Sequence, residues 1–443
     1  MEIAAPKRQI TFVQTVSIII GQVIGSGIFI NIPIVANITN NVWLSILIWF
    51  LGGLLWLPQI FILAEMGTAY PEQGGPYYFI NKAGSPFLAF VYTWTAFLTS
   101  DTPTLTIIGL LAADALSYFF PVLSISIYAK LFAVFLILSF SLIQYRSVKL
   151  GSNVQVILTI SKLLPLFAVV FIGLFFLNSG NLTFTKISST NSTKNFIELI
   201  PAGIGATVWA YAGFLNILYT SGEVVNPQKV LPKALISSIL FVMFAYVLIS
   251  FFTSAIVPFD VITKIENGKF INPFNYVDSL KEIAGGLFAI AVFISMLGVM
   301  NSSVITQPRL EYAMAKDGLF FNKFAKLHPV YLTPGFSIFA QAVFAIVLLV
   351  GDVNELLGYF SLSYVIQNLL VYASIFFLHK RQDYKPTYKS PLWILMAILS
   401  VLIQIYLAYG IIIAFPIGGL LACLFLIITA LPFYLYFRRT LTK

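Results

Sequence analysis

One apolar stretch near the N-terminus reads Ser17-Ile-Ile-Ile-Gly-Gln-Val-Ile-Gly-Ser-Gly-Ile-Phe29. It places Gly25, Ser26 and Gly27 near the middle of a long apolar run, and two glycines flanking a serine weaken a helix. Non-helical backbone at that depth in a membrane is tolerated only where protein or a water-filled cavity satisfies the freed polar groups. We therefore expect this helix to be interrupted beside a cavity.

The free backbone groups of such a break suit a zwitterion. The second half-helix would begin near Ile28, where unpaired N–H groups and the positive end of the dipole favour a carboxylate. The first half would end near Ile24 with unpaired carbonyl groups, which accept hydrogen bonds from an ammonium group. The alternative is that Gly21 and Gly25, four residues apart, form a close-packing motif between helices.

The composition of the chain excludes a water-soluble fold. Of its 443 residues, 59% are hydrophobic and 9% are charged, whereas soluble proteins carry about 25% charged residues. One cysteine, Cys423, and two histidines in polar connections leave no cluster for a metal, so we expect neither metal nor cofactor. Apolar runs of roughly membrane-spanning length occupy residues 11–36, 42–68, 87–115, 127–145, 152–177, 199–221, 234–257, 283–305, 334–350, 356–378, 392–411 and 417–437.

These twelve spans would put both termini on one side of the membrane, and the basic residues indicate which side. If the N-terminus is cytoplasmic, 18 of the 25 lysines and arginines lie in inside connections, six lie outside, and Lys162 lies within a span. We therefore predict cytoplasmic termini. The asymmetry also explains the net charge of +9 without nucleic-acid binding.

A polar connection at residues 178–198 divides the chain. It separates a first five-helix unit, residues 1–177, from a second, residues 199–378, which two further helices follow within residues 379–443. Asn181 and Asn191 match the glycosylation sequon, although an ordinary polar loop is the favoured interpretation. The sixth run contains Trp209-Ala-Tyr-Ala-Gly-Phe214, with small residues at the position that corresponds to the first break. Interrupted segments at matching places in two halves indicate a transporter binding site.

Several further motifs follow in a fixed order along the chain. They are Gly21-x-x-Ile24-Gly-Ser-Gly-Ile-Phe29, Ala210-Tyr-x-Gly213, Glu223-x-x-Asn226-Pro, Leu231-Pro, Asn301-Ser, Arg309-Leu and Asp317-Gly. In this ordered set the chain resembles the L-amino acid transporter family of the amino acid–polyamine–organocation superfamily. The resemblance implies an all-α membrane protein with a leucine-transporter-type fold: twelve transmembrane helices, arranged as two inverted five-helix repeats plus two trailing helices.

The resemblance also implies that an amino acid is held between helices 1 and 6. Gly25, Ser26, Gly27 and Ile28 match the stretch that binds the substrate carboxylate. Ile24 matches an acceptor for the amino group.

On helix 6, the backbone around Trp209 and Ala210 matches the other amino-group acceptors, next to Gly213. The Trp209 side chain matches the gating aromatic. Phe214 and Leu215 would border the same pocket and make it apolar, which favours neutral side chains.

Lys162 is a basic residue in the interior of a span. It lies about 11 residues into its run, so ~16 Å of helix separates it from the cytoplasmic end, and a lysine at such depth needs acceptors. The resemblance implies that its ammonium stands in for the sodium ion of related transporters. We expect backbone carbonyls of helix 1 and the hydroxyls of Ser302 and Ser303 as acceptors, and we expect sodium-independent exchange. Sequence does not decide whether Lys162 keeps its proton, so proton symport stays open.

Asp101 departs from the family pattern. It could pair with Lys162, bind a cationic substrate group, face a wet cavity, or cap the break at Pro103. Asn301 adds polarity nearby, although its more usual role is bonding between helices.

Three charged residues, Glu65, Glu223 and Arg309, lie at cytoplasmic span ends. They could pair on a closed inner gate, but solvation at the interface is the favoured interpretation.

Together these patterns predict a sodium-independent exchanger of neutral L-amino acids in the plasma membrane that works by alternating access. The alternatives are proton-coupled uptake of an amino acid or cationic amine, a channel, and an intramembrane enzyme with Ser26 as nucleophile. The enzyme is disfavoured because no histidine lies in a span. Resembling animal transporters are linked to a glycoprotein partner through a cysteine between helices 3 and 4. Residues 117–127 contain none, so we expect no disulfide-linked heavy subunit.

Overall fold

The computed structural model describes residues 6–25, 27–182, 196–266, 269–351, 353–414 and 418–441. Within these ranges the regular structure is helical, apart from one isolated β-bridge between Ile10 and Val224. The elements of the first half are α1 Phe12–Val23, α2 Gly27–Thr39, α3 Val42–Ala69, α4 Gly75–Lys82, α5 Pro86–Thr95, η1 Ala96–Asp101, α6 Thr102–Ser117, η2 Pro121–Ser124, α7 Ser126–Arg146, α8 Val148–Gly173 and η3 Leu174–Phe176.

The second half begins with another interrupted helix. Its elements are α9 Phe196–Thr207, η4 Val208–Tyr211, η5 Phe214–Glu223, α10 Pro227–Ile256, α11 Phe259–Ile262, η6 Pro273–Tyr276, η7 Asp278–Leu280, α12 Ala284–Thr306, α13 Pro308–Lys316, α14 Gly335–Leu348, α15 Val353–Leu378, α16 Trp393–Ala414 and α17 Gly418–Leu441.

Each predicted apolar run coincides with helical structure. Among the described residues, six helices are long and apolar enough to cross a membrane, and the bent pair α1–α2 makes a seventh candidate. Three shorter apolar helices cover Gly335–Leu348, Ser363–Leu378 and Trp393–Tyr409. The chain is therefore an all-helical membrane protein, while the total of twelve spans stays a prediction.

The helix starts follow from local sequence. Thr11 and Gln14 form a reciprocal capping box at α1, in which each side chain satisfies the other residue's backbone N–H. Asn41 caps α3 and Ser147 caps α8 in the same chemical way, by accepting from a backbone N–H in the first turn. Residues at these positions of the sequence therefore determine where these three helices begin.

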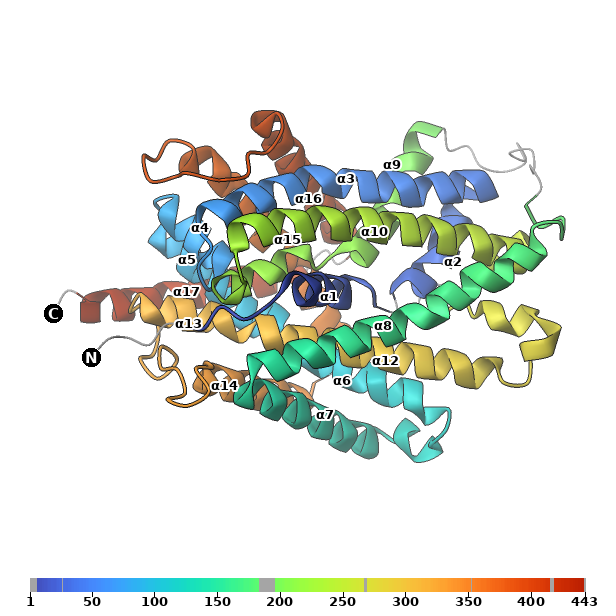
Figure 1. Ribbon diagram of the computed structural model, residues 1–443, viewed down its shortest axis with the longest axis horizontal. Coiled ribbons are helices and arrows are strands. Elements are labelled where there is room, and N and C mark those ends of the chain that lie inside the picture. The colour runs from blue at the N-terminus through green and yellow to red at the C-terminus, as the bar shows by residue number, and fades with distance from the viewer. Residues whose placement is uncertain are drawn as a thin grey trace.

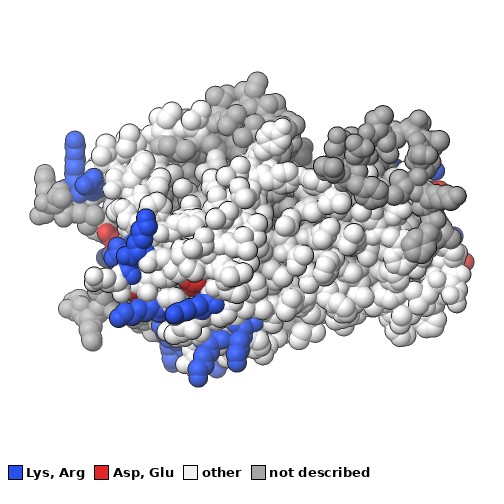
Figure 2. Space-filling view, turned by 90° about the horizontal axis from the view of Figure 1, so that it is seen from above, with Lys and Arg blue, Asp and Glu red and all other residues white. Residues whose placement is uncertain are grey.

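The long helices run roughly along one axis of the bundle (Figure 1). α10 packs along α3, and α12 packs against α6 and α8. The first and last described segments lie at the same end of the bundle (Figure 1), and lysines and arginines gather at that end in the face shown in Figure 2. This clustering agrees with the uneven distribution of lysine and arginine among the connections of the sequence.

The outer surface of the bundle is apolar. Large hydrophobic side chains of α7 and α8 are exposed along the full length of both helices, among them Phe135, Ile157, Leu164 and Phe171. Many polar side chains are instead buried between helices. This inverted distribution suits a surface covered by lipid.

Candidate functional site

The first span breaks at the predicted position. α1 ends at Val23, Ile24 has an extended conformation, and α2 begins at Gly27 with its axis turned by 48° from that of α1. The first N–H groups of α2 have no acceptor within their own helix, so the break presents donors and a positive dipole end. Ser26 lies outside the described residues.

The sixth span breaks as well, and the two breaks touch. α9 gives way to the tight helical turn η4, and Gly213 then adopts a left-handed conformation with φ of 118° before η5 begins. A Cβ atom at Gly213 would lie 2.9 Å from Cγ of Gln22 on α1, so only glycine fits both the conformation and the contact.

Tyr246 on α10 forms hydrogen bonds with both breaks. Its hydroxyl lies 3.3 Å from the carbonyl oxygen of Val23 and 3.0 Å from that of Ala210, and it donates to these oxygens. On the other side, the N–H of Gly213 donates to the hydroxyl of Tyr364 at 3.2 Å. The irregular backbone is therefore partly satisfied by side chains, as membrane depth requires.

Lys162 on α8 donates to the first break. Its Nζ lies 2.8 Å from the carbonyl oxygen of Gly21 and 2.6 Å from that of Ile24, and the residue is 3% exposed. Ser295 on α12 donates to the same Ile24 oxygen at 3.2 Å. A Cβ atom at Gly298 would lie 2.9 Å from Cε of Lys162, so the glycine leaves room for the lysine stem.

The contacts of Lys162 match the expectation in one part and correct it in another. The expected acceptors on helix 1 are present, but Ser302 and Ser303 are not its partners. The hydroxyl of Ser302 donates to the carbonyl of Ile18 at 2.9 Å, and Ser303 bonds the side chain of Gln22. The reason is helical rise, because Ser302 lies about 10 Å along α12 from Ser295.

Asn301 bonds between helices. Its Nδ2 donates to the carbonyl of Gly151 at 3.0 Å and to Oε1 of Gln155 at 2.7 Å, and its Oδ1 accepts from Gln144 at 2.9 Å. The residue is completely buried and does not line the cavity described next.

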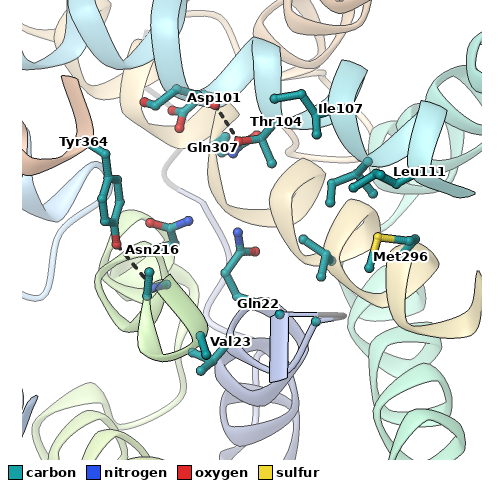
Figure 3. A pocket seen from close by; sticks show the side chains of 18 of the residues that line it. Gln22, Val23, Asp101, Thr104, Ile107, Leu111, Asn216, Met296, Gln307 and Tyr364 are labelled. Atoms are coloured by element: carbon teal, nitrogen blue, oxygen red, sulfur yellow. Dashed lines mark hydrogen bonds between the residues drawn. The ribbon is translucent and has the colours of Figure 1, made fainter. Parts of the chain in front are cut away.

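A cavity of about 180 Å³ lies where the two breaks meet (Figure 3). This volume is several times the ~30 Å³ share of one water molecule in the liquid. The lining residues expected from sequence are Gly25, Gly27, Ala210 and Gly213. Gln22 and Val23 also line the cavity, at the expected end of the first half-helix. Those that sequence reasoning missed are Ser100, Thr104, Asn216, Tyr219, Gln307, Tyr364 and Gln367 on the polar side, and Ile107, Ile108, Leu111, Ala212, Met296 and Val299 on the apolar side.

Other expected site residues lie beside this cavity or elsewhere. Ile28 is completely buried in the core. Ile24 borders a much smaller cavity together with Lys162. Phe214 packs its ring against Trp56 instead of bordering the pocket, because the left-handed turn at Gly213 redirects the chain. The side chain of Trp209 lies outside the described residues.

The carbonyl of Ile24 is already engaged. Its oxygen accepts from both Lys162 and Ser295, and a carbonyl oxygen has two lone pairs. In this conformation it has no lone pair left for a substrate, so its role as an amino-group acceptor stays a prediction.

Asp101 lines the same cavity. It ends the π-helical turn η1 and makes no capping bond to α6, so the local role at Pro103 is wrong. It is 4% exposed, and among the described residues its Oδ2 has no hydrogen-bond partner and the side chain has no ion pair. Pairing with Lys162 is therefore also wrong in this conformation.

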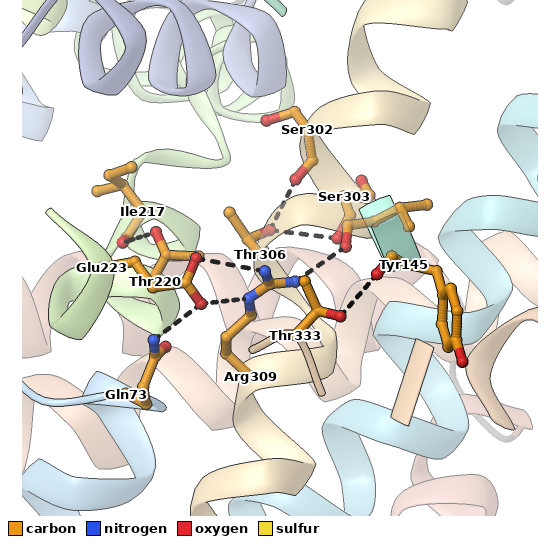
Figure 4. A network of polar contacts seen from close by, with 11 residues as sticks. Gln73, Tyr145, Ile217, Thr220, Glu223, Ser302, Ser303, Thr306, Arg309 and Thr333 are labelled. Atoms are coloured by element: carbon orange, nitrogen blue, oxygen red, sulfur yellow. Dashed lines mark hydrogen bonds and ion pairs between the residues drawn. The ribbon is translucent and has the colours of Figure 1, made fainter. Parts of the chain in front are cut away.

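A buried polar network joins the turn after α3, the end of η5 and the start of α13 (Figure 4). Nε of Arg309 lies 3.0 Å from Oε1 of Glu223 and Nη2 lies 3.3 Å from Oε2, with side chains 0% and 2% exposed. Gln73, in the turn between α3 and α4, donates to the same carboxylate at 2.9 Å. Solvation was the wrong interpretation for Glu223 and Arg309, because the connection from α3 and the end of α12 bury them.

Glu65 belongs to a separate buried cluster. Its carboxylate lies 2.7 Å from Nε2 of His379 and accepts from the hydroxyl of Tyr384 at 3.0 Å and from the backbone N–H of Ser390 at 2.7 Å. For Glu65, too, solvation at the membrane interface was the wrong interpretation. This cluster attaches the connection after α15 to α3.

The two sequons have different outcomes. Asn181 donates its side-chain amide to the carbonyl of Ala255 at 2.9 Å, as expected of an ordered polar loop. Asn191 lies outside the described residues.

Two broken helices that meet at a solute-sized cavity inside an apolar-surfaced bundle are typical of a membrane transporter. The chain belongs to the amino acid permease family, whose model matches residues 10–434. It is thus a multi-pass integral membrane protein that transports amino acids, and it is not an enzyme.

Curated relatives extend over most of the chain. It is 28% identical over 406 residues to the serine/threonine exchanger SteT of Bacillus subtilis, covering 89% of each chain. It is 27% identical to the b(0,+)-type amino acid transporter 1 of Mus musculus, covering 97% of this chain and 88% of the relative. It is 28% identical to the cystine/glutamate transporter of Homo sapiens, covering 88% and 77%. The predicted resemblance to the L-amino acid transporter family within the wider superfamily is confirmed.

Proposed function

We propose that this protein is a sodium-independent exchanger of neutral L-amino acids that works by alternating access. The observation that carries the proposal is the meeting of both helix breaks at one cavity, with the Lys162 ammonium bonded to the carbonyls of the first break. The names of the relatives describe exchangers and transporters of amino acids, which supports the same class of activity.

Substrate recognition rests on main-chain groups. The carboxylate binds N–H groups of the stretch Gly25, Ser26, Gly27 and Ile28 that leads into α2, where the helix dipole favours negative charge. The N–H of Gly25 donates to the carbonyl of Val23 at 3.0 Å in this conformation, so it must leave that acceptor to join the site. The amino group faces the carbonyls that end α1 and those around Ala210. Because main-chain groups bind the part that all amino acids share, the apolar wall of the cavity selects the side chain, which favours neutral substrates.

Lys162 replaces a coupling cation. An ammonium that already donates to Gly21 and Ile24 fills the position where a sodium ion would need oxygen ligands. Ser295 completes the contact, while Ser302 and Ser303 hold α12 against α1 about two turns away. Transport then depends on no sodium gradient.

Alternating access needs gates on both sides. We assign the outer gate to the Trp209 side chain, as the family resemblance implies. The inner gate is the network of Arg309, Glu223 and Gln73, which must open to release substrate inward.

The proposed topology follows from the family. It has twelve spans in two inverted repeats, residues 1–177 and 199–378, joined by an extracellular loop at 178–198 and followed by two helices within 379–443. Both termini are cytoplasmic and the protein lies in the plasma membrane. Because residues 117–127 lack cysteine, it works without a disulfide-linked heavy subunit.

Counterflow in proteoliposomes tests this function. Vesicles loaded with unlabelled amino acid should take up labelled amino acid faster than empty vesicles, and replacing sodium with choline should change nothing. Equal uptake by loaded and empty vesicles would contradict exchange, and a sodium requirement would contradict the role of Lys162.

The Gly25→Leu substitution should block the cavity. A Cβ atom at this position would have Val299 Cγ2 at 3.9 Å as its nearest neighbour, so alanine fits, but a leucine side chain would extend into the substrate space. We expect Gly25→Leu to lower amino acid affinity by at least about tenfold, measured as loss of the ligand-induced thermal shift. Gly25→Ala is the matched control, and equal shifts in the two variants would place the substrate elsewhere.

Asp101 favours a second candidate function. A buried carboxyl that lines the cavity, and whose Oδ2 has no hydrogen-bond partner among the described residues, is the group that proton-coupled uptake would need. Acidification of the vesicle lumen during uptake, followed with a trapped pH dye, separates symport from exchange.

A further inference from the structure

The carboxyl of Asp101 is a buried acidic group that amino acid exchange by main-chain contacts does not use. The residue is 4% exposed and shares the cavity with Gly25 and Gly213. Figure 3 places it on the wall opposite Gln22 and Val23, the end of α1. Its Oδ2 has no hydrogen-bond partner in the part of the chain that the structure describes.

The local backbone does not need this carboxyl. The π-helical turn Ala96–Asp101 frees carbonyl groups, but hydroxyls satisfy them: Thr102 donates to Phe97 and Thr104 donates to Ser100, both at 2.6 Å. Asp101 itself makes no capping bond. π-helical turns occur often at functional sites, and this one ends at Asp101 in the cavity wall.

The groups around Asp101 supply no positive charge. Its electrostatic neighbours are Glu311 on α13 and the hydroxyls of Tyr92, Tyr219 and Tyr364. Glu311 is completely buried, and both its oxygens accept from Nε2 of Gln341, at 3.0 and 3.1 Å.

The buried cations nearby are committed to other partners. Lys162 donates to carbonyls of α1, and Arg309 pairs with Glu223. The wall that carries Asp101 therefore has an acidic character that no described side chain neutralises.

A buried carboxylate without a counter-charge is costly, whereas one that pairs with a desolvated cation and keeps its hydrogen bonds is stabilised. Apolar side chains, among them Ile107, Ile108, Met296 and Val299, form part of the cavity wall. This arrangement offers a main-chain site at one wall, an aliphatic surface, and an acid at the opposite wall.

We propose that Asp101 binds the side-chain cation of an amino acid, so that the transporter accepts substrates with an aliphatic side chain ending in an ammonium or guanidinium group. The proposal rests on the proposed function, in which main-chain groups of the two breaks hold the zwitterion, and it extends the substrate class from neutral to cationic amino acids. The aliphatic part of the side chain lies along the apolar residues of the wall, and its charged end meets the carboxyl group of Asp101.

Lysine and norleucine test this directly, because they differ only in the terminal ammonium group. Proteoliposomes loaded with unlabelled norleucine would take up labelled lysine or labelled norleucine. The wild type should exchange both. Asp101→Asn, which keeps the shape and removes the charge, should lower lysine uptake at subsaturating concentration by about 10- to 100-fold, the range for a lost charge-assisted hydrogen bond. It should change norleucine uptake by less than about threefold.

The matched control is Asp114→Asn, the same chemical change at an exposed position of α6, which should leave both substrates unchanged. Norleucine exchange by Asp101→Asn also reports that this variant is folded.

Four results would overturn the proposal. The wild type could exchange norleucine but not lysine, or Asp101→Asn could take up lysine as the wild type does. Either result would leave the proposed exchange intact. Equal loss of both substrates in Asp101→Asn would make Asp101 a structural or proton-carrying group. Absence of stimulated uptake for either amino acid in the wild type would overturn the proposed function as well.

Discussion

Replacing Lys162 with methionine should reduce amino acid exchange about 100-fold or more. The substitution keeps an unbranched apolar stem, one atom shorter, but leaves the carbonyls of Gly21 and Ile24 without their ammonium donor. Each hydrogen bond to a charged group contributes ~1.5–3 kcal/mol, and every 1.4 kcal/mol is about a factor of ten. Because these carbonyls end α1 at the substrate cavity, the loss should disorder the binding backbone. Counterflow of a neutral amino acid measures the expected loss of exchange.

The control for this prediction is Lys149→Met on the same helix. Lys149 is exposed, so its replacement should leave exchange within about twofold of the wild type. Size-exclusion chromatography of both variants would show that they are folded. Wild-type counterflow by Lys162→Met would contradict the assignment of Lys162 to the break.

Replacing Arg309 with methionine should strongly destabilise the protein. It leaves the Glu223 carboxylate buried, with Gln73 as its remaining side-chain donor. Breaking a buried ion pair by removing one partner costs ~3–5 kcal/mol, whereas removing both charges costs much less. We therefore expect the apparent Tm of Arg309→Met in detergent to fall by about 5 °C or more, and Glu223→Gln in the same chain to restore part of the loss.

Arg381→Met is the matched comparison. Arg381 also pairs with an acid, Asp383, but both side chains are more than 40% exposed. A hydrogen bond from Arg381 lowers the pKa of the Asp383 carboxyl, yet exposed pairs contribute little to stability. The apparent Tm of Arg381→Met should stay within about 1 °C of the wild type. If Arg309→Met were equally neutral, the inner network would not hold the closed gate.

The helix break was predictable from the sequence because glycine is a local signal. Gly25 and Gly27 weaken the helix wherever they occur, and the small residues around Gly213 repeat the signal in the second half. Lys162 was equally visible, since a lysine deep in an apolar run needs acceptors. Helix 1 as the source of those acceptors came from the family resemblance.

The partners across helices were not predictable, because side-chain packing sets them. Ser295, and not Ser302 or Ser303, meets the break, since the register of α12 against α1 depends on contacts such as Gly298 against Lys162. The pairing of Arg309 with Glu223 joins residues 86 positions apart. The sequence could raise this pairing as an alternative, but no pattern in it could choose pairing over solvation.

The residues that line the cavity were likewise predictable only in part. The polar residues Asn216, Gln307 and Gln367 line it, and polar side chains in apolar runs were a usable signal that we did not exploit. The π-helical turn that ends at Asp101 could not be foreseen, since its sequence, Ala96-Phe-Leu-Thr-Ser-Asp101, is compatible with an ordinary helix.

A cryo-electron microscopy structure with a bound amino acid tests the central claim most directly. The account predicts density in the cavity between Gly25 and Gly213, with the substrate carboxylate about 3 Å from the first backbone N–H groups of α2. A continuous α-helix from Phe12 to Thr39, or an amino acid bound away from both breaks, would contradict it.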